Sequence, residues 1–259
     1  MSINQTVSRS AVDRARSPFT LRTFAIGGAV LAAILISLRL YEQAFGWSMG
    51  LDSFSEEYRL YWQPLLVLSI PLSLLACCAV AAYIWRTRDR NLDAVAPVEE
   101  LRRYHVLAQW LALYGLSLFT ALSFFTEQTA VWHMTAVRDC DFTPSNIVTF
   151  YISYPMFVVF GVAAYAYAVT RLPFFSRGYS LPFIVLLVGT FMTIPNVGFN
   201  EWGHTFWVLD EGFASPLHWG FAFFGWMALG CFGVTLQILS RMRGLMGAEV
   251  AVAVARRRR

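Results

Sequence analysis

The segment YWQPLLVLSIPLSLLACCAVAAYIW, residues 61–85, contains no charged residue. A helix needs roughly 20 mainly apolar residues to cross the hydrocarbon core of a bilayer, so this segment is long enough to span a membrane. Further apolar segments of similar length lie at about 20–44, 104–125, 147–170, 179–199 and 215–240. An open sheet leaves backbone groups unsatisfied in lipid, and these segments are too long for barrel strands. We therefore expect an all-α, polytopic membrane helix bundle with about six transmembrane helices.

The composition supports a membrane location. Of the 259 residues, 57% are hydrophobic and 14% are charged, and the mean hydropathy is +0.52. A soluble domain of this size would be less apolar, whereas the 22 Phe and 9 Trp suit lipid-facing surface and interfacial belts. We expect one integral membrane domain over residues 20–243, between an N-terminal tail, 1–19, and an arginine-rich tail, 244–259.

The arginines predict the orientation, because the chain contains no lysine. They gather before the first apolar segment, between the second and third, between the fourth and fifth, and after the sixth. The other three connections carry most of the acids, and Glu42 and Glu57 are counted among them. Cytoplasmic loops collect basic residues, so both termini are predicted to be cytoplasmic. The pI of about 9.0 therefore reflects topology, and no basic and aromatic patch indicates nucleic-acid binding. We expect the terminal arginines to contact anionic membrane lipid.

Two of the four histidines lie in the segment NEWGHTFWVLDEGFASPLHW, residues 200–219, on the predicted outer side. Polar groups near membrane depth are costly, so they are more often functional there than in soluble proteins. In a helix, Asn200 and His204 share one face because they are four residues apart, and His218 begins the sixth apolar segment. Imidazole suits copper, zinc and iron. The spacing alone leaves two interpretations open: a metal site, or interfacial histidines that hydrogen-bond headgroups and backbone.

A resemblance to a known family rests on the motifs YEQAFGWSMGLDSFSEEY, FFTEQTAVWHMTAVRDCDFTPS, SRGYSLPF and IPNVGFNEWGHTFWVLDEGFASPLHWGFAFFGWMALG. Over about residues 40–243, the chain resembles the C subunit of the copper membrane monooxygenases, which include methane, ammonia and short-chain hydrocarbon monooxygenases. The resemblance implies a trimer of protomers that each contain A, B and C subunits. It also implies copper as the cofactor, a quinol or other electron donor, and hydroxylation of a small substrate with O2.

The family's asparagine–histidine–histidine copper site falls without a gap on Asn200, His204 and His218. The resemblance therefore implies that these residues hold the catalytic copper, toward the outer face of the bacterial cytoplasmic membrane. Glu201 and Glu211 are acids of the same segment. Either is a candidate to orient an imidazole N–H or to relay protons.

A neighbouring family site uses an aspartate and two histidines, and the matching positions here are Thr129, His133 and Asn146. One imidazole with a hydroxyl and an amide provides no anionic ligand and holds Cu(II) weakly. Cys140 and the acids around it are alternative ligands, but nothing in the sequence fixes their direction. We expect this second site to be degraded, and weak or vacant.

Three functions are compatible with these residues. The one we favour is a copper monooxygenase subunit that hydroxylates a short-chain hydrocarbon and is active only in the assembled complex. The altered second site favours this branch over the main methane and ammonia oxidisers. The second is a structural or copper-storing subunit, in a complex that oxidises ammonia or methane on a partner subunit. The third is a haem or quinone protein, which is disfavoured because bis-histidine haem requires imidazoles that face each other inside the bundle.

Overall fold

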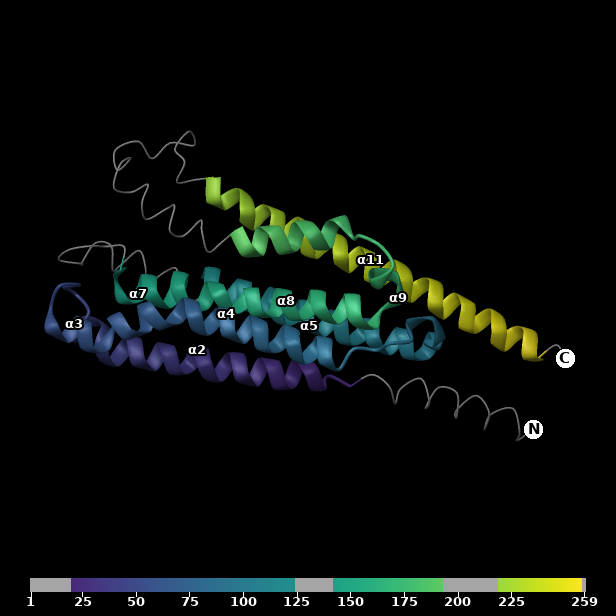
Figure 1. Cartoon of the computed structure of the whole chain (residues 1–259), viewed down its shortest axis with the longest axis horizontal. Helices are drawn as coiled ribbons and strands as arrows, with labels where there is room; N and C mark the ends of the chain where they lie inside the picture. Colours follow the sequence, from purple (N-terminus) through teal and green to yellow (C-terminus); the bar gives the residue numbers. More distant parts are fainter. Residues whose placement is uncertain (1–19, 124–141, 193–218, 258–259) are drawn as a thin grey trace.

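The described chain is helical apart from short connections (Figure 1). The structure is a computed structural model that describes residues 20–123, 142–192 and 219–257, with side chains in the last range only for 225–247. No strand occurs within these ranges. The prediction of an all-α fold is confirmed.

Two long helices joined by a short hairpin form the first part of the bundle. α2 (Arg22–Met49) and α4 (Gln63–Arg86) are connected through α3 (Glu56–Tyr61). Ser55 caps α3, because its hydroxyl accepts a hydrogen bond from Tyr58 N at 3.1 Å. Trp62 joins α3 to α4; it is fully buried, and its indole N–H donates to Phe45 O at 3.3 Å. The hairpin is thereby fixed to the end of α2.

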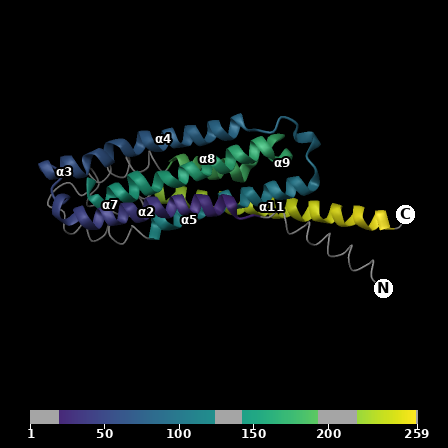
Figure 2. The same ribbon diagram turned by 90° about the horizontal axis from the view of Figure 1, so that it is seen from below.

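α8 (Tyr154–Arg171) is the central helix of the bundle. Together with α7 (Pro144–Asn146) and η3 (Ile147–Ser153) it forms one apolar segment. In the apolar 18-residue stretch of that segment, 67% of the residues are buried. The corresponding fraction is 11% for the segments that contain α2 and α4, so these helices lie at the periphery. α8 packs against α4 and against α5 (Pro97–Ser123), and from below it lies between α4 and α2 (Figure 2).

The last helices form a second layer on the side of α5 and α8 away from α2 (Figure 1). η1 (Leu92–Ala94) precedes α5, and α9 (Pro173–Ser176) leads from α8 to the helix Leu181–Met192, which packs against α11 (Trp219–Arg257). Gly230 and Gly233 of α11 face that helix, and a side chain at Gly230 would place its Cβ 2.5 Å from Leu186 N. Small residues allow this close approach of membrane helices.

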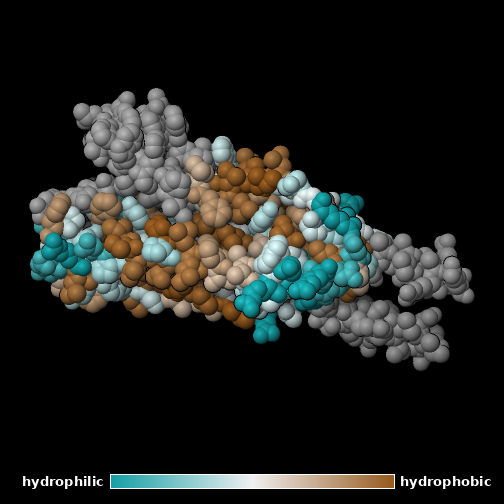
Figure 3. All heavy atoms as spheres, in the orientation of Figure 1, coloured by the Kyte–Doolittle hydropathy of each residue, from teal (hydrophilic) through white to brown (hydrophobic). Residues whose placement is uncertain are grey.

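The membrane character of the chain is confirmed. Within the described residues, three segments are long and apolar enough to cross a membrane: Arg22–Met49, Glu56–Arg86 and Pro144–Arg171. They coincide with the first, second and fourth predicted spans, while α5, the helix Leu181–Met192 and α11 lie at the third, fifth and sixth. Apolar side chains cover much of the surface between the polar ends (Figure 3). The total of six spans stays a prediction.

The two ends of the described chain lie at the same end of the bundle (Figures 1 and 2). We call it the arginine-rich end, because it holds the connections around Arg86–Arg90, Arg102–Arg103 and Arg171. Arg103 donates to Asp89 Oδ2 at 2.8 Å, to Glu99 Oε1 at 2.9 Å and to Arg171 O at 2.9 Å. Hydrogen bonds from Arg102 lower the pKa of Glu99 to about 2. Termini at a common end agree with the predicted topology, and the side of the membrane stays a prediction.

Two details differ from expectation. α11 continues without a break to Arg257, although the apolar segment was expected to end near residue 240. Residues 241–257 include four Ala and four Arg, with Met, Leu and Glu, which favour helix, but also three Val and two Gly, which do not. Glu42, counted among the acids of a connection, lies inside α2 and is buried. The division into a membrane domain and two tails is left as a prediction.

Candidate functional site

The predicted ligands lie almost entirely outside the described residues. Asn200, His204 and His218 fall outside them, as do Thr129 and His133 and the two candidate acids, Glu201 and Glu211. Only Asn146 of the second site is described. Across residues 20–123, 142–192 and 219–257, no three His, Cys, Asp or Glu side chains gather as a metal site. What the structure provides is the framework that holds the flanks of the two ligand-bearing segments.

Asn146 belongs to the folded core of this framework. It is 1% exposed and ends the short helix α7, where its backbone N–H donates to Thr143 Oγ1 at 3.3 Å. The π-helix η3 follows directly, and π-turns are frequent at functional sites. The side chain at this position is therefore held by its helix, whether or not it contacts a metal.

Contacts from α2 and α3 fix the start of α7. Gly50, the C-cap of α2, lies against the ring of Pro144, and a side chain at Gly50 would overlap that ring. Tyr58 on α3 donates from its hydroxyl to Phe142 O at 2.5 Å. The chain that returns from the segment carrying Thr129 and His133 is thus anchored at its first described residue.

The second ligand-bearing segment is anchored by the helix Leu181–Met192 and by α11. Thr190 hydrogen-bonds the hydroxyl of Tyr114 on α5 at 2.9 Å, and both side chains are buried. α11 approaches through Gly230 and Gly233, as described above. Thr190 lies ten residues before Asn200 in the sequence. These contacts fix the two points between which Asn200, His204 and His218 lie.

Both anchored flanks lie in the half of the bundle away from the arginine-rich end. α7 lies near that far end, while α11 begins and the helix Leu181–Met192 ends nearer the middle (Figure 1). The two segments that carry predicted ligands therefore rejoin the bundle in the same half. The sequence prediction that both sites are on one side of the membrane is consistent with this arrangement.

Glu42 is a chemically notable residue that the sequence analysis did not single out. Its side chain is 3% exposed, on the α2 face that also buries Leu31, Leu35 and Gly46. Neither carboxylate oxygen makes a hydrogen bond with another described residue, and Arg39 Nη1 is 3.8 Å away. A carboxylate buried in a membrane helix is costly and is usually functional. The feature that could have identified it is the position of a carboxylate inside the 28-residue apolar helix α2, rather than in the connection that follows the helix.

These features define a polytopic helical membrane protein whose histidine-containing segments are held in one half of the bundle. Residues 4–249 match the family model for the C subunit of ammonia monooxygenase/methane monooxygenase. The chain belongs to this family. Its members are subunits of copper-containing monooxygenase complexes. Membership of the family therefore implies an oxidoreductase complex that also contains A and B subunits. A comparison with curated proteins gives no match.

The donor sets can be compared with copper on chemical grounds. Two imidazoles and an amide oxygen at Asn200, His204 and His218 suit copper, because imidazole is a strong ligand for Cu(I) and Cu(II). Thr129, His133 and Asn146 supply a single imidazole, and Asn146 is packed into a helix end. The first set fits copper and the second does not fit it well.

Proposed function

We propose that this chain carries the catalytic copper of a membrane monooxygenase, with Asn200, His204 and His218 as ligands. The observation that carries the proposal is the family match over residues 4–249, together with an unbroken asparagine–histidine–histidine set in the sequence. When bound, copper supplies one-electron chemistry with O2, and the complex inserts one oxygen atom into a small substrate.

The residues of the chain position and tune this site. Imidazoles at His204 and His218 provide strong neutral donors, and Asn200 adds a weak third donor one helical turn from His204. Glu201 and Glu211 are the candidates to accept an imidazole N–H or to move a proton, because a second hydrogen-bond partner fixes the orientation of a ligating histidine. The described helices hold the two flanks of the segment, which supports a fixed location for it in the bundle.

The second site is proposed to be degraded. Thr129 and Asn146 replace an anionic ligand and an imidazole, which leaves His133 as the only strong donor. The burial of Asn146 supports a structural role for this position. Catalysis by this chain then depends on the Asn200, His204 and His218 site alone.

The substrate and partners follow from the same reasoning. The altered second site separates this chain from the main methane and ammonia oxidisers, so we propose a short-chain hydrocarbon as the substrate. Hydroxylation requires the A and B subunits, in a trimer of ABC protomers, and electrons from a quinol or another donor. The copper lies toward the outer face of the bacterial cytoplasmic membrane.

The test compares single-histidine variants in the assembled complex. We expect His204→Ala to abolish hydroxylation and to remove copper from this site, because loss of one of two imidazoles weakens binding by orders of magnitude. His133→Ala should have a smaller effect. His105→Gln is the control, because His105 lies on α5 near the arginine-rich end. Copper per complex and substrate turnover are measured for each variant.

Each outcome has a defined meaning. Equal loss of copper and activity in His133→Ala and His204→Ala would show that the second site is still a working copper site. If His204→Ala lost copper but kept turnover, the chain would have a structural or copper-storing role, with the chemistry on a partner.

A further inference from the structure

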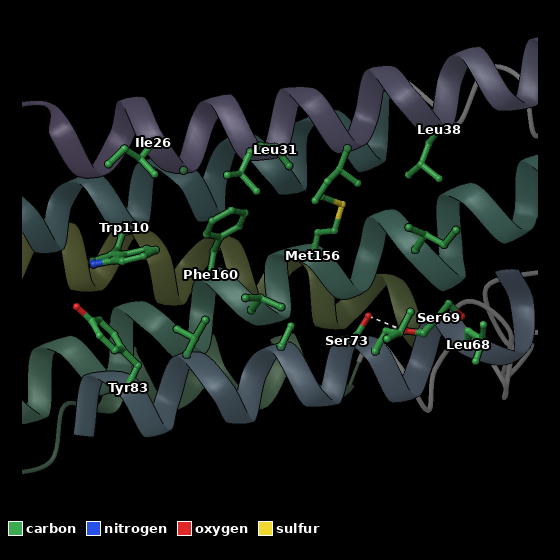
Figure 4. A pocket seen from close by; sticks show the side chains of 18 of the residues that line it. Ile26, Leu31, Leu38, Leu68, Ser69, Ser73, Tyr83, Trp110, Met156 and Phe160 are labelled. Carbon is green, nitrogen blue, oxygen red and sulfur yellow. Dashed lines mark hydrogen bonds between the residues drawn. The ribbon is translucent and has the colours of Figure 1, made fainter. Parts of the chain in front are cut away.

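A long apolar groove runs between α2 and α4, with α8 at its base (Figure 4). Its volume is about 860 Å³. Along α2 the lining extends from Thr23 to Leu38, which corresponds to roughly 22 Å at 1.5 Å per residue. Along α4 it extends from Leu65 to Tyr83. The groove therefore follows most of the hydrocarbon thickness of a bilayer, which is about 30 Å.

The inner surface of the groove offers nothing to a polar ligand. Its two serines on α4 are already satisfied by their own helix: Ser69 Oγ donates to Leu66 O and Ser73 Oγ to Ser69 O, both at 2.8 Å. The remaining lining at this depth is aliphatic, with Met156 and Phe160 of α8 at the base (Figure 4). Any occupant at this depth is a hydrocarbon.

The end of the groove nearest the arginine-rich end is different. Tyr83 of α4 and Trp110 of α5 lie there, with the phenol oxygen and the indole nitrogen toward that end (Figure 4). Gln109, next to Trp110, accepts from Phe24 N at 3.0 Å, which places Trp110 level with the start of α2. Neither the Tyr83 hydroxyl nor the Trp110 indole N–H hydrogen-bonds another described group. Such amphipathic rings are typical of the level of lipid headgroups.

Two cations extend this end of the groove. Arg22 directly precedes Thr23 on α2, and Arg86 lies one turn beyond Tyr83 on the same side of α4. Both arginines are exposed, and neither forms an ion pair with a described acid. The two acids that follow Arg86 in the sequence, Asp89 and Asp93, are already paired with Arg103 and Arg177 and therefore do not compete. The groove is apolar along its length and cationic at one end.

We propose that the α2–α4 groove binds an anionic phospholipid from the leaflet at the arginine-rich end. Its acyl chains lie against α2, α4 and α8, and its phosphate meets Arg22 and Arg86, with Tyr83 and Trp110 at the level of the glycerol backbone. An apolar transmembrane helix of a partner subunit could cover the aliphatic lining, but it would supply no anion for Arg22 and Arg86. A small apolar substrate would not require cations or ring N–H and O–H groups at one end.

The experiment uses the assembled complex, purified and depleted of lipid. A phosphatidylglycerol with a diazirine on one acyl chain is added, and cross-linked peptides are mapped. Phosphatidylcholine with the same label is the comparison. We expect phosphatidylglycerol adducts on α2 and α4 within the groove. The double variant Arg22→Gln/Arg86→Gln should lower phosphatidylglycerol labelling about 25-fold, because each arginine near a membrane surface contributes about fivefold. Its phosphatidylcholine labelling should not change.

Matched variants separate the groove from the rest of the surface. Ala76 lines the groove, so Ala76→Phe fills it and should suppress labelling by both lipids. Ala82 lies on the same helix, is exposed and is not part of the lining, so Ala82→Phe should label like the wild type. Arg90→Gln is the matched control for the two arginines, because it removes one charge from the same end of the bundle.

Three results would overturn the proposal. The first is an absence of adducts in the groove of the wild-type complex. The second is equal labelling by the two lipids in the wild type, which would remove the role of the cations. The third is cross-linking of a benzoyl-phenylalanine at position 76 to a partner-subunit peptide, which would show that a protein helix covers the groove. The measured quantity is bound lipid rather than hydroxylation, so the result is independent of the copper site.

Discussion

Gly230→Ala is expected to damage the copper site without changing any ligand. An added Cβ at this position would lie 2.5 Å from Leu186 N and 2.7 Å from Leu186 Cα, both backbone atoms. Ordinary carbon contacts begin near 3.4 Å, so α11 and the helix Leu181–Met192 must separate by about 3.4 − 2.5 = 0.9 Å. No side-chain rotation can relieve a contact with backbone. Overpacking of this kind costs about 1–3 kcal/mol.

The displacement matters because these two helices hold both flanks of the segment that carries Asn200, His204 and His218. A misplacement of about 1 Å at reacting groups reduces activity by about 100-fold. We expect Gly230→Ala to lose between about ten- and 100-fold in hydroxylation and to bind copper more weakly. Copper per complex, turnover and the apparent melting temperature of the assembled complex are the measurements.

Gly225→Ala is the matched control on the same helix. No atom lies within 4 Å of the Cβ that it would add, and alanine favours helix over glycine by about 1 kcal/mol. It should therefore keep copper and turnover and be at least as stable as the wild type. If Gly230→Ala behaved like Gly225→Ala in all three measurements, the idea that this helix pair positions the ligands would be refuted.

Three further predictions concern the topology and the arginine-rich end. In a background without native cysteines, Phe54→Cys should react with a membrane-impermeant maleimide applied from outside, and Asn91→Cys only after permeabilisation; the reverse pattern would invert the orientation. Arg171→Gln should destabilise the complex by about 1–3 kcal/mol, because Arg171 donates to two backbone carbonyls at the end of α4 at 3.0 and 3.1 Å; Arg90→Gln should leave the melting temperature unchanged. The pKa of Glu99 is lowered to about 2, so its contribution to folding stability is complete above its ordinary pKa of 4.5 and is lost as pH falls toward 2. The side chain is 36% exposed, so solvent screening limits this contribution. Glu99→Gln should therefore lower the stability in thermal unfolding by at most about 1 kcal/mol at pH 7 and not at all at pH 2.

The fold was predictable because lipid imposes a simple rule on sequence. Residues 61–85 are uncharged, so burial in hydrocarbon and internal backbone hydrogen bonding leave helix as the remaining solution. The helix ends were less predictable. Arg241 and Arg243 mark the end of the apolar segment, yet α11 continues past them to Arg257, through a stretch that contains Ala but also Gly and Val.

The packing could not be predicted from hydropathy. Peripheral α4 and central α8 are both apolar, and α4 is the more apolar of the two segments, although far less of it is buried. Lipid and protein interior are equally apolar solvents, so hydrophobicity does not distinguish the face toward lipid from the face toward another helix. The groove between α2 and α4 was invisible in the sequence for the same reason.

The candidate ligands were found by chemistry and family pattern rather than by hydropathy. Histidine and asparagine stand out where most neighbours are apolar or aromatic, which is why His204 and His218 were evident. Glu42 was overlooked because the first apolar segment was expected to end near it, whereas α2 continues to Met49 and buries this carboxylate. Its burial depends on how α2 packs against its neighbours, which the sequence does not show.

The two ends of the bundle are held together by different kinds of contact. At the arginine-rich end, Arg103 and Arg171 join α4, α5 and α8 through charged hydrogen bonds, which water and headgroups can tolerate. At the other end, Gly50 lies on Pro144 and Tyr58 donates to Phe142 O, while the ion pair of Arg59 with Glu56 is exposed and stays within α3. The two contacts that hold the start of α7 are therefore uncharged. In the proposed site, two neutral imidazoles and an amide would bind the copper ion, and we expect acids of the same segment, Glu201 and Glu211 among them, to balance its charge.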